Sequence, residues 1–174
     1  MNELPDRPRL LYFNVMPGLE PGFYEPFLDA GLDAIIIGTV PTGGVPSEGE
    51  YSFIPFIREA TKLEIPVFLL RGSLSASRRP EHEQRCYRRN MGAIYMPEMF
   101  AIKAGEKPPE VHAIKSGATP LERPDVSQEV EVVGAIARVY SRRPGYHEGV
   151  REVSEIFSSP EFIEQVKSIR EKQF

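Results

Sequence analysis

The sequence predicts an α/β protein, a three-layer sandwich with a small, mostly parallel sheet. Short aliphatic runs alternate with amphipathic segments along the first 70 residues, in the order strand, helix, strand, helix, strand. The runs are apolar throughout and are bounded by Gly or Pro, which is typical of strands that helices cover on both faces. Such an order implies βαβ units with right-handed crossovers, whose neighbouring strands are parallel.

Three runs are expected to form the core strands. They are Arg9 to Met16, Leu32 to Gly38 and Ile65 to Leu70. The first run ends at a Pro-Gly turn, and the second, LDAIIIG, lies between glycines. Because the second run is rich in β-branched residues, we expect it to lie in the centre of the sheet.

Two helices are expected to connect these strands. The first covers Glu20 to Ala30, and its apolar residues fall at i, i+4 and i+5, on one face of a short helix. These residues are Phe23, Phe27 and Leu28. The second helix covers Tyr51 to Leu63, where apolar residues recur with charged residues between them, as in an amphipathic helix packed on a sheet.

The rest of the chain is expected to complete the same single domain, residues 1–174. The stretch of about 104–124 is dense in Gly and Pro, which predicts an irregular insertion with at most one short strand, around Val111 to Ile114. A helical period resumes over Ser127 to Tyr140 and begins a helical extension of about 126–174. Two more short helices are expected there, at Val150 to Phe157 and Phe162 to Ile169.

The composition is that of an ordinary globular domain. The chain has 174 residues, of which 41% are hydrophobic and 26% are charged. Its net charge of -4 gives no general attraction to nucleic acid, which is not an expected partner. The longest apolar stretches fall far short of the roughly 20 residues that cross a bilayer, so no membrane contact is expected. Because the N-terminal residues lack a signal-peptide pattern and Cys86 is the single cysteine, we expect a cytoplasmic protein without an intramolecular disulfide.

The residue pattern predicts neither a metal site nor a cofactor. The three histidines, His82, His112 and His147, are far apart and have no partner at metal-ligand spacing. The sequence has no P-loop, no G-x-S-x-G elbow and no G-x-G-x-x-G after the first strand. The chemistries that depend on these three motifs are therefore not expected.

Three segments follow one another in the order of a known family. They are YFNVMPG at Tyr12 to Gly18, GLDAIIIGTVPTGGVP at Gly31 to Pro46, and FIPFIREATKLEIPVFLLRGS at Phe53 to Ser73. They correspond to a strand ending in a Pro-Gly turn, a glycine-preceded strand with a Gly-rich loop ending in Pro, and an amphipathic helix leading to an "IPV" strand. In these segments the chain resembles the smaller, C-terminal domain of type I L-asparaginases and of the related archaeal tRNA-dependent amidotransferase subunit.

The resemblance implies a role in binding or assembly. In the family this domain packs against the catalytic domain and takes part in dimer contacts. The family's nucleophilic threonine, its second Thr-Asp pair and its lysine lie in the N-terminal domain, so no catalytic residue is carried over to this sequence. An apolar face without that domain should be covered by another chain. We therefore expect a homodimer or other homo-oligomer, or a complex with a separately encoded chain like the catalytic asparaginase N-terminal domain.

Residues that follow the second and third strands form the candidate ligand site. They are Thr39, Thr42, Gly43, Gly44, Arg71 and Ser73. Ligands of open α/β sheets bind at the carboxyl ends of the strands, where Gly-rich turns offer amide groups to anions and arginine pairs with carboxylates. A small carboxylate is the expected ligand. Alternatively, the glycines only make a tight connection, and the arginine is a surface ion-pair partner.

Two other functions stay open. One is an independent amidohydrolase that acts on asparagine- or glutamine-like amides through the same residues, although a threonine nucleophile needs a nearby base and the local sequence has none. The other is a sensor in which arginines between Arg71 and Arg89 bind a small anion or a nucleotide. The simpler interpretation of that Arg-rich stretch is a solvated charged face.

Overall fold

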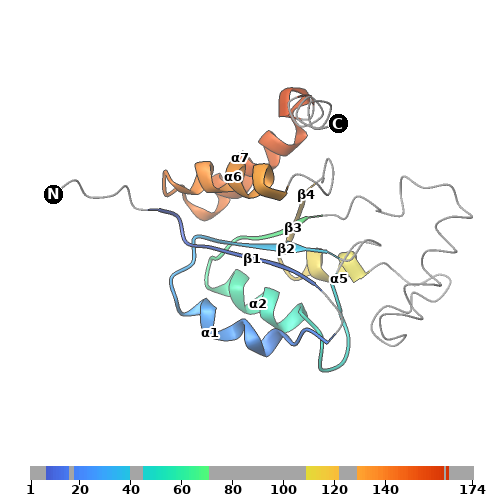
Figure 1. The fold of residues 1–174 in the computed structure, drawn as a ribbon. Coiled ribbons are helices and arrows are strands. Elements are labelled where there is room, and N and C mark those ends of the chain that lie inside the picture. Colours follow the sequence, from blue (N-terminus) through green and yellow to red (C-terminus); the bar gives the residue numbers. More distant parts are fainter. Residues whose placement is uncertain are drawn as a thin grey trace, which may run out of the picture.

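A computed structural model describes residues 7–15, 18–39, 45–70, 109–121, 129–162 and 164. Strand β1 (Leu10–Asn14) is followed by the 3-10 helix η1 (Pro21–Phe23), helix α1 (Glu25–Leu28) and strand β2 (Ala34–Gly38). Helix α2 (Ile54–Lys62) leads to strand β3 (Val67–Leu70), and helix α5 (Pro109–Lys115) leads to strand β4 (Thr119–Leu121). Helices α6 (Glu129–Tyr140) and α7 (Tyr146–Ser158) follow (Figure 1).

The four described strands form one sheet in the order β1-β2-β3-β4, and each neighbouring pair is parallel. The prediction of a parallel sheet with β2 in its interior is confirmed. A strand order that follows the chain places the connecting helices on one face when the crossovers are right-handed. Figure 1 shows this arrangement, with α1, α2 and α5 on one side of the sheet and α6 and α7 on the other. The fold is the three-layer α/β sandwich that the sequence predicts.

The two faces of the sheet bury alternate residues of the same strands. Ile35 and Ile37 of β2 belong to the core on the side of α1 and α2, whereas Ile36 belongs to the core under α6 and α7. On that second side the ring of Phe68 from β3 lies 6.2 Å from the ring of Tyr140 from α6. Burial on both faces explains why β2 and β3 are apolar at every position rather than at every second one.

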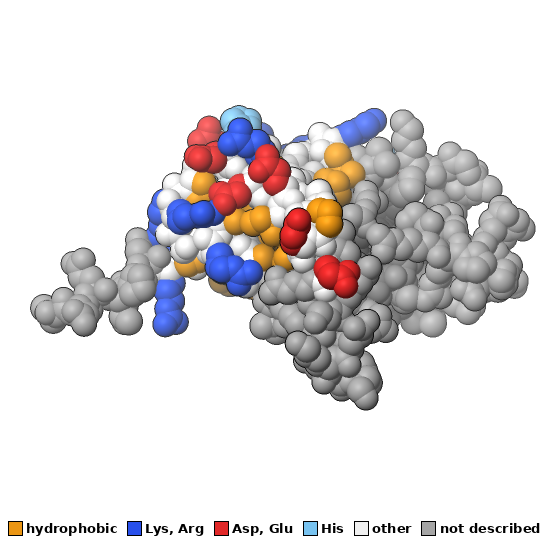
Figure 2. Space-filling model, turned by 90° about the horizontal axis from the view of Figure 1, so that it is seen from above, with side chains coloured by type: hydrophobic (Ala, Val, Ile, Leu, Met, Phe, Trp, Pro, Cys, Tyr) orange, Lys and Arg blue, Asp and Glu red, His pale blue; other side chains and the backbone are white. Residues whose placement is uncertain are grey.

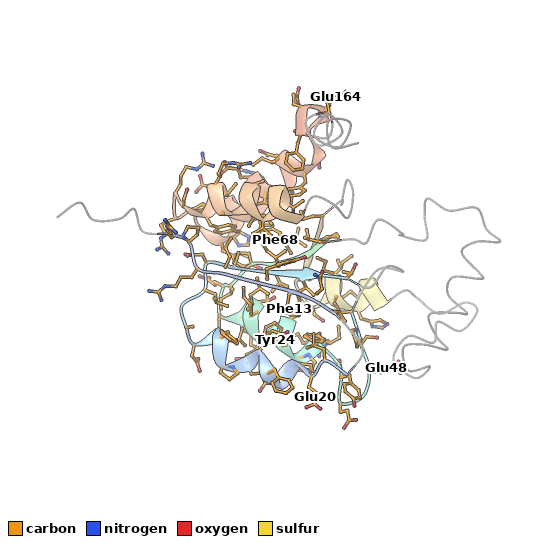
Figure 3. All side chains as sticks on the ribbon, viewed as in Figure 1. Phe13, Glu20, Tyr24, Glu48, Phe68 and Glu164 are labelled. Carbon is orange, nitrogen blue, oxygen red and sulfur yellow. The ribbon has the colours of Figure 1, made fainter. Side chains whose placement is uncertain are left out.

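The segment between β1 and β2 differs from its prediction. We expected Phe23 and Phe27 on the buried face with Leu28, but their exposed fractions are 70% and 46%, and only Leu28 is buried. Tyr24 points inward in their place and stacks on Phe13 of β1, with ring centroids 4.0 Å apart (Figure 3). The reason lies in two prolines, one in the first turn of η1 and one in the first turn of α1. They divide the segment into two short helices, so the residue spacing of one continuous helix does not apply.

The short strand expected around Val111 to Ile114 is wrong, because these residues lie in helix α5. The strand of this region is β4, which begins at Thr119, after Gly117 has turned the chain with a φ of 112°. Ala113 of α5 is fully buried in the core on the side of α2, so this segment packs against that core with one face of a helix. So short a run offers too few positions to separate a period of 3.6 from a period of 2.

The helices after β4 form the second outer layer. The helix expected over Ser127 to Tyr140 is observed as α6, and the one expected over Val150 to Phe157 is part of the longer α7. Most of the expected helix at Phe162 to Ile169 lies outside the described residues. Among the helices that the structure describes, none combines the length and the apolar character needed to cross a membrane.

Polar contacts tie the turn between α6 and α7 to the amino end of β2. Asp33 accepts hydrogen bonds from the backbone N–H of Arg9, at 2.7 Å, and from the guanidinium of Arg143. The Arg9 guanidinium donates in turn to the carbonyl oxygen of Ala30, at 2.8 Å. These bonds join the residue before β1, the connection from α1 to β2 and the turn between α6 and α7. The candidate site lies at the opposite edge of the sheet, at the carboxyl ends of the strands.

Candidate functional site

Thr39 lies at the carboxyl edge of the sheet, where the sequence places it. It follows β2, and its side-chain hydroxyl donates a hydrogen bond of 2.9 Å to the carbonyl oxygen of Leu70, the last residue of β3. The Thr39 backbone N–H donates to the same oxygen at 3.0 Å. Thr39 is 7% exposed, so its hydroxyl links the ends of β2 and β3 and does not face open solvent.

Asn14 lies beside Thr39 at this edge, and the sequence-based site did not include it. It is the last residue of β1, and the sheet register pairs it with Gly38 of β2. A Cβ atom on Gly38 would come within 1.8 Å of the Asn14 side-chain oxygen, so the amide group occupies the space that the glycine leaves. The same oxygen accepts a hydrogen bond of 3.2 Å from the Tyr12 hydroxyl. A polar residue at the end of an apolar run could have drawn attention to Asn14 in the sequence. Its pairing with Gly38 could not have been found there, because the pairing depends on the register of the two strands.

The other residues of the predicted ligand site lie outside the part of the chain that the structure describes. They are Thr42, Gly43, Gly44, Arg71 and Ser73. The described part therefore brings together Asn14, Gly38 and Thr39. The order of the four described strands does not reverse, so these strands contain no switch point of the kind that opens a ligand crevice in doubly wound folds.

A groove lies between α1 and α2, the helices that cover the core containing Ile35 and Ile37. Its volume is about 430 Å³, and its lining residues are Glu25, Leu28, Asp29, Pro55, Phe56, Glu59 and Leu63. Leu28 and Phe56 are buried and form an apolar floor, whereas Leu63 is 48% exposed. Three of the lining side chains are carboxylates. Glu59 forms an ion pair with Lys62 at 2.9 Å, and within the described residues the other two form none.

The large hydrophobic residues with high exposure all lie in this same layer, as far as the chain is described. They are Phe23, Phe27, Leu63 and Ile114. Figure 2 shows the opposite side, formed by α6 and α7, where a small apolar strip lies among charged side chains. The apolar residues at the margin of that layer are only partly exposed: Val133, Val150 and Ile156. The two outer layers thus differ, and the layer of η1, α1 and α2 has the stronger features of a contact surface.

The titratable groups of the described residues do not assemble into a metal site. No three His, Cys, Asp or Glu side chains among these residues lie close enough together to hold an ion. The clearest perturbation is at Tyr140, where burial raises the pKa of the hydroxyl, and the nearby Tyr146 and Asp33 raise it further. The Tyr140 hydroxyl is buried against Gly149 of α7, and no hydrogen-bond partner for it is found in the described part of the chain.

Comparison with protein-family models and with curated proteins finds no match for this chain. The candidate sites therefore have to be judged on their own geometry. That geometry consists of a closed edge at Asn14, Gly38 and Thr39, and of an open apolar surface with a groove at η1, α1 and α2.

Proposed function

We propose that the chain is an assembly domain, like the smaller domain of the L-asparaginase family, and that it binds a second chain through the surface of η1 and α1. The observation that carries this proposal is the exposure of two phenylalanines, Phe23 at 70% and Phe27 at 46%, while the residues beside them pack inward. The second chain is a copy of this one or a separately encoded chain with a catalytic domain. The single cysteine supports a cytoplasmic site of action.

The free energy gained by burying Phe23 and Phe27, compared with the cost of association, indicates how large the contact has to be. An aromatic side chain buries about 150–250 Å², so covering the exposed parts of Phe23 and Phe27 removes roughly 200 Å² from water. At about 25 cal/mol per Å² this contributes roughly 5 kcal/mol. Association costs about 4–15 kcal/mol in lost freedom, so the two rings can anchor a contact but cannot hold it alone. We therefore extend the contact to the neighbouring groove, where Leu63 is also exposed.

The order of the secondary-structure elements supports the proposed kinship. The order of a strand with a turn, a buried second strand, an amphipathic helix and a third buried strand is the order that the resemblance implies. An α/β sandwich is shared by many unrelated functions, so the function rests on the surface rather than on the fold.

Independent catalysis has less support among the described residues. A threonine nucleophile is activated by a base that accepts its proton. The Thr39 hydroxyl donates instead to the main-chain carbonyl of Leu70, and it is almost completely buried. This position is suited to holding two strands together.

Light scattering on the size-separated full chain tests the assembly proposal. We expect a mass above that of one chain, or a mass increase when a chain bearing the catalytic asparaginase domain is added. The double variant Phe23→Ser/Phe27→Ser should return the protein to a single chain, whereas Ile114→Ser should not. A wild-type protein that remains a monomer and pairs with no catalytic-domain chain would overturn the proposal.

A further inference from the structure

We propose that the groove between α1 and α2 binds a basic peptide segment of the partner chain. One aliphatic or aromatic side chain of that segment would lie in the groove against the exposed Pro55 and Leu63, and Lys or Arg residues on either side of it would pair with the carboxylates of the groove. This inference rests on the proposed assembly function and adds the chemistry of the partner.

The floor of the groove is preformed. Phe56 is 1% exposed and Leu28 is 8% exposed, so both are fixed by the core beneath them. The Tyr24 ring meets Phe56 edge-on at 6.4 Å and stacks on Phe13, which holds α1 at its distance from α2. A floor supported in this way accepts an apolar side chain without first rearranging, which lowers the cost of binding.

The size of the groove limits its occupant. A volume of about 430 Å³ lies near the lower end of the roughly 300–1,000 Å³ that small-molecule pockets span. The groove lies between two helices and is partly open to solvent, and its exposed apolar lining, Pro55 and Leu63, comes from the α2 side. One or two side chains of an extended or helical segment fit this shape, and the rest of the segment would lie over α1.

The charge of the groove selects a cation. Glu25 and Asp29 come from the α1 side and Glu59 from α2, so carboxylates stand on both walls. Lys62 offsets Glu59, but both side chains are highly exposed, at 71% and 52%, and such a pair is weak and easily exchanged. Phosphate, nucleic acid and acidic peptides would be repelled. A cation without an apolar part would leave the exposed Leu63 uncovered, so the fitting ligand combines both features in one segment.

Fluorescence anisotropy with labelled peptides tests the inference on the full chain. The probe is a short peptide with a central leucine between two pairs of arginines, and the matched peptides replace the leucine by serine or the arginines by glutamates. We expect the serine peptide to bind at least tenfold more weakly, the glutamate peptide not to bind, and the affinity of the leucine peptide to fall as salt rises. Equal binding of the leucine and serine peptides would overturn the proposal.

Variants of the protein locate the binding. Leu63→Ser and the pair Glu25→Gln/Asp29→Asn should each weaken binding of the leucine peptide, the charge variant by roughly fivefold. The matched controls are Ile114→Ser, an exposed hydrophobic outside the groove, and Glu155→Gln, an exposed carboxylate on α7. Circular dichroism confirms that each variant is folded, and unchanged affinity in folded groove variants would overturn the proposal.

The two proposals fail in different ways. If the chain assembles with a second chain but the leucine peptide does not bind, the assembly function stands and the basic-segment inference is wrong. If the peptide binds in the groove while the chain neither self-associates nor pairs with a catalytic-domain chain, the groove chemistry is supported and the assembly function is wrong.

Discussion

The Tyr140 hydroxyl lies against Gly149, where a Cβ atom would come within 2.8 Å of its oxygen. At this point α7 packs directly on the Tyr140 ring of α6, so a side chain larger than that of glycine would require the ring to shift. Among the residues that the structure describes, the buried Tyr140 hydroxyl has no hydrogen-bond partner. The packing of these two helices therefore contains one polar group that folding removes from water without compensation.

Replacing Tyr140 by phenylalanine should stabilise the protein. The change keeps the ring that packs on Phe68 and removes the hydroxyl whose burial costs free energy. We expect the free energy of unfolding to rise by about 1 kcal/mol in urea or guanidinium titrations. A loss of stability in this variant would mean that the hydroxyl has a partner, such as a bound water.

The stability of the protein should fall at high pH through the same hydroxyl. Its pKa is raised in the folded state, so between the ordinary tyrosine pKa of about 10 and the higher folded value the unfolded chain loses a proton that the folded chain keeps. The contribution of Tyr140 to stability is fully present below about pH 10 and is lost as the pH rises through the folded pKa, by up to about 1.4 kcal/mol per pH unit. We would measure the free energy of unfolding at about pH 9, 10 and 11. It should decline less with pH in Tyr140→Phe than in the wild type. Equal declines would contradict the assignment.

A methyl group at Gly38 should destabilise the sheet, and a change at Asn14 should restore it. In Gly38→Ala the new Cβ would collide with the Asn14 side chain, and the next nearest atom beyond that side chain is the Asn14 Cα at 3.5 Å, an ordinary contact. Because Asn14 is exposed and its amide can partly turn aside, we expect a loss of about 1 kcal/mol for the single variant, the lower end of the cost of added bulk. The double variant Gly38→Ala/Asn14→Ala should recover most of it in a double-mutant cycle measured by denaturation. Additive losses would show that the side chain is not the source of the clash.

Removing the Thr39 hydroxyl should weaken the link between β2 and β3. In Thr39→Val the Leu70 carbonyl keeps the backbone N–H of residue 39 but loses the hydroxyl, at an expected cost of about 1 kcal/mol. Thr39→Ser keeps the donor and serves as the control. Thermal denaturation of the two variants checks this order, and a valine variant as stable as the wild type would contradict it.

The strands could be predicted from the sequence because their signal is local. The runs that became β2 and β3 are apolar at every position, and burial on both faces requires that composition. The position of Thr39 at the carboxyl edge also followed, because parallel neighbours end at the same side. These inferences need only the order of the elements and the direction of the strands.

The side of η1 and α1 that packs on the sheet could not be predicted in the same way. The spacing of Phe23 and Phe27 favours one buried face, but the prolines break the segment, and the stacking of Tyr24 on Phe13 decides which side turns inward. The contact between Asn14 and Gly38 could not be predicted for a related reason. It depends on the register between two strands, which no local pattern contains.

The succession of elements has a consequence for synthesis on the ribosome. The helices that cover one side of the sheet are interleaved with the strands, so that side is enclosed as the strands are made. The other side, with Ile36 and Phe68, is covered by α6 and α7, which are translated after all four described strands. Until those helices emerge, the nascent chain presents an uncovered aliphatic sheet, the stage at which chaperones are most needed.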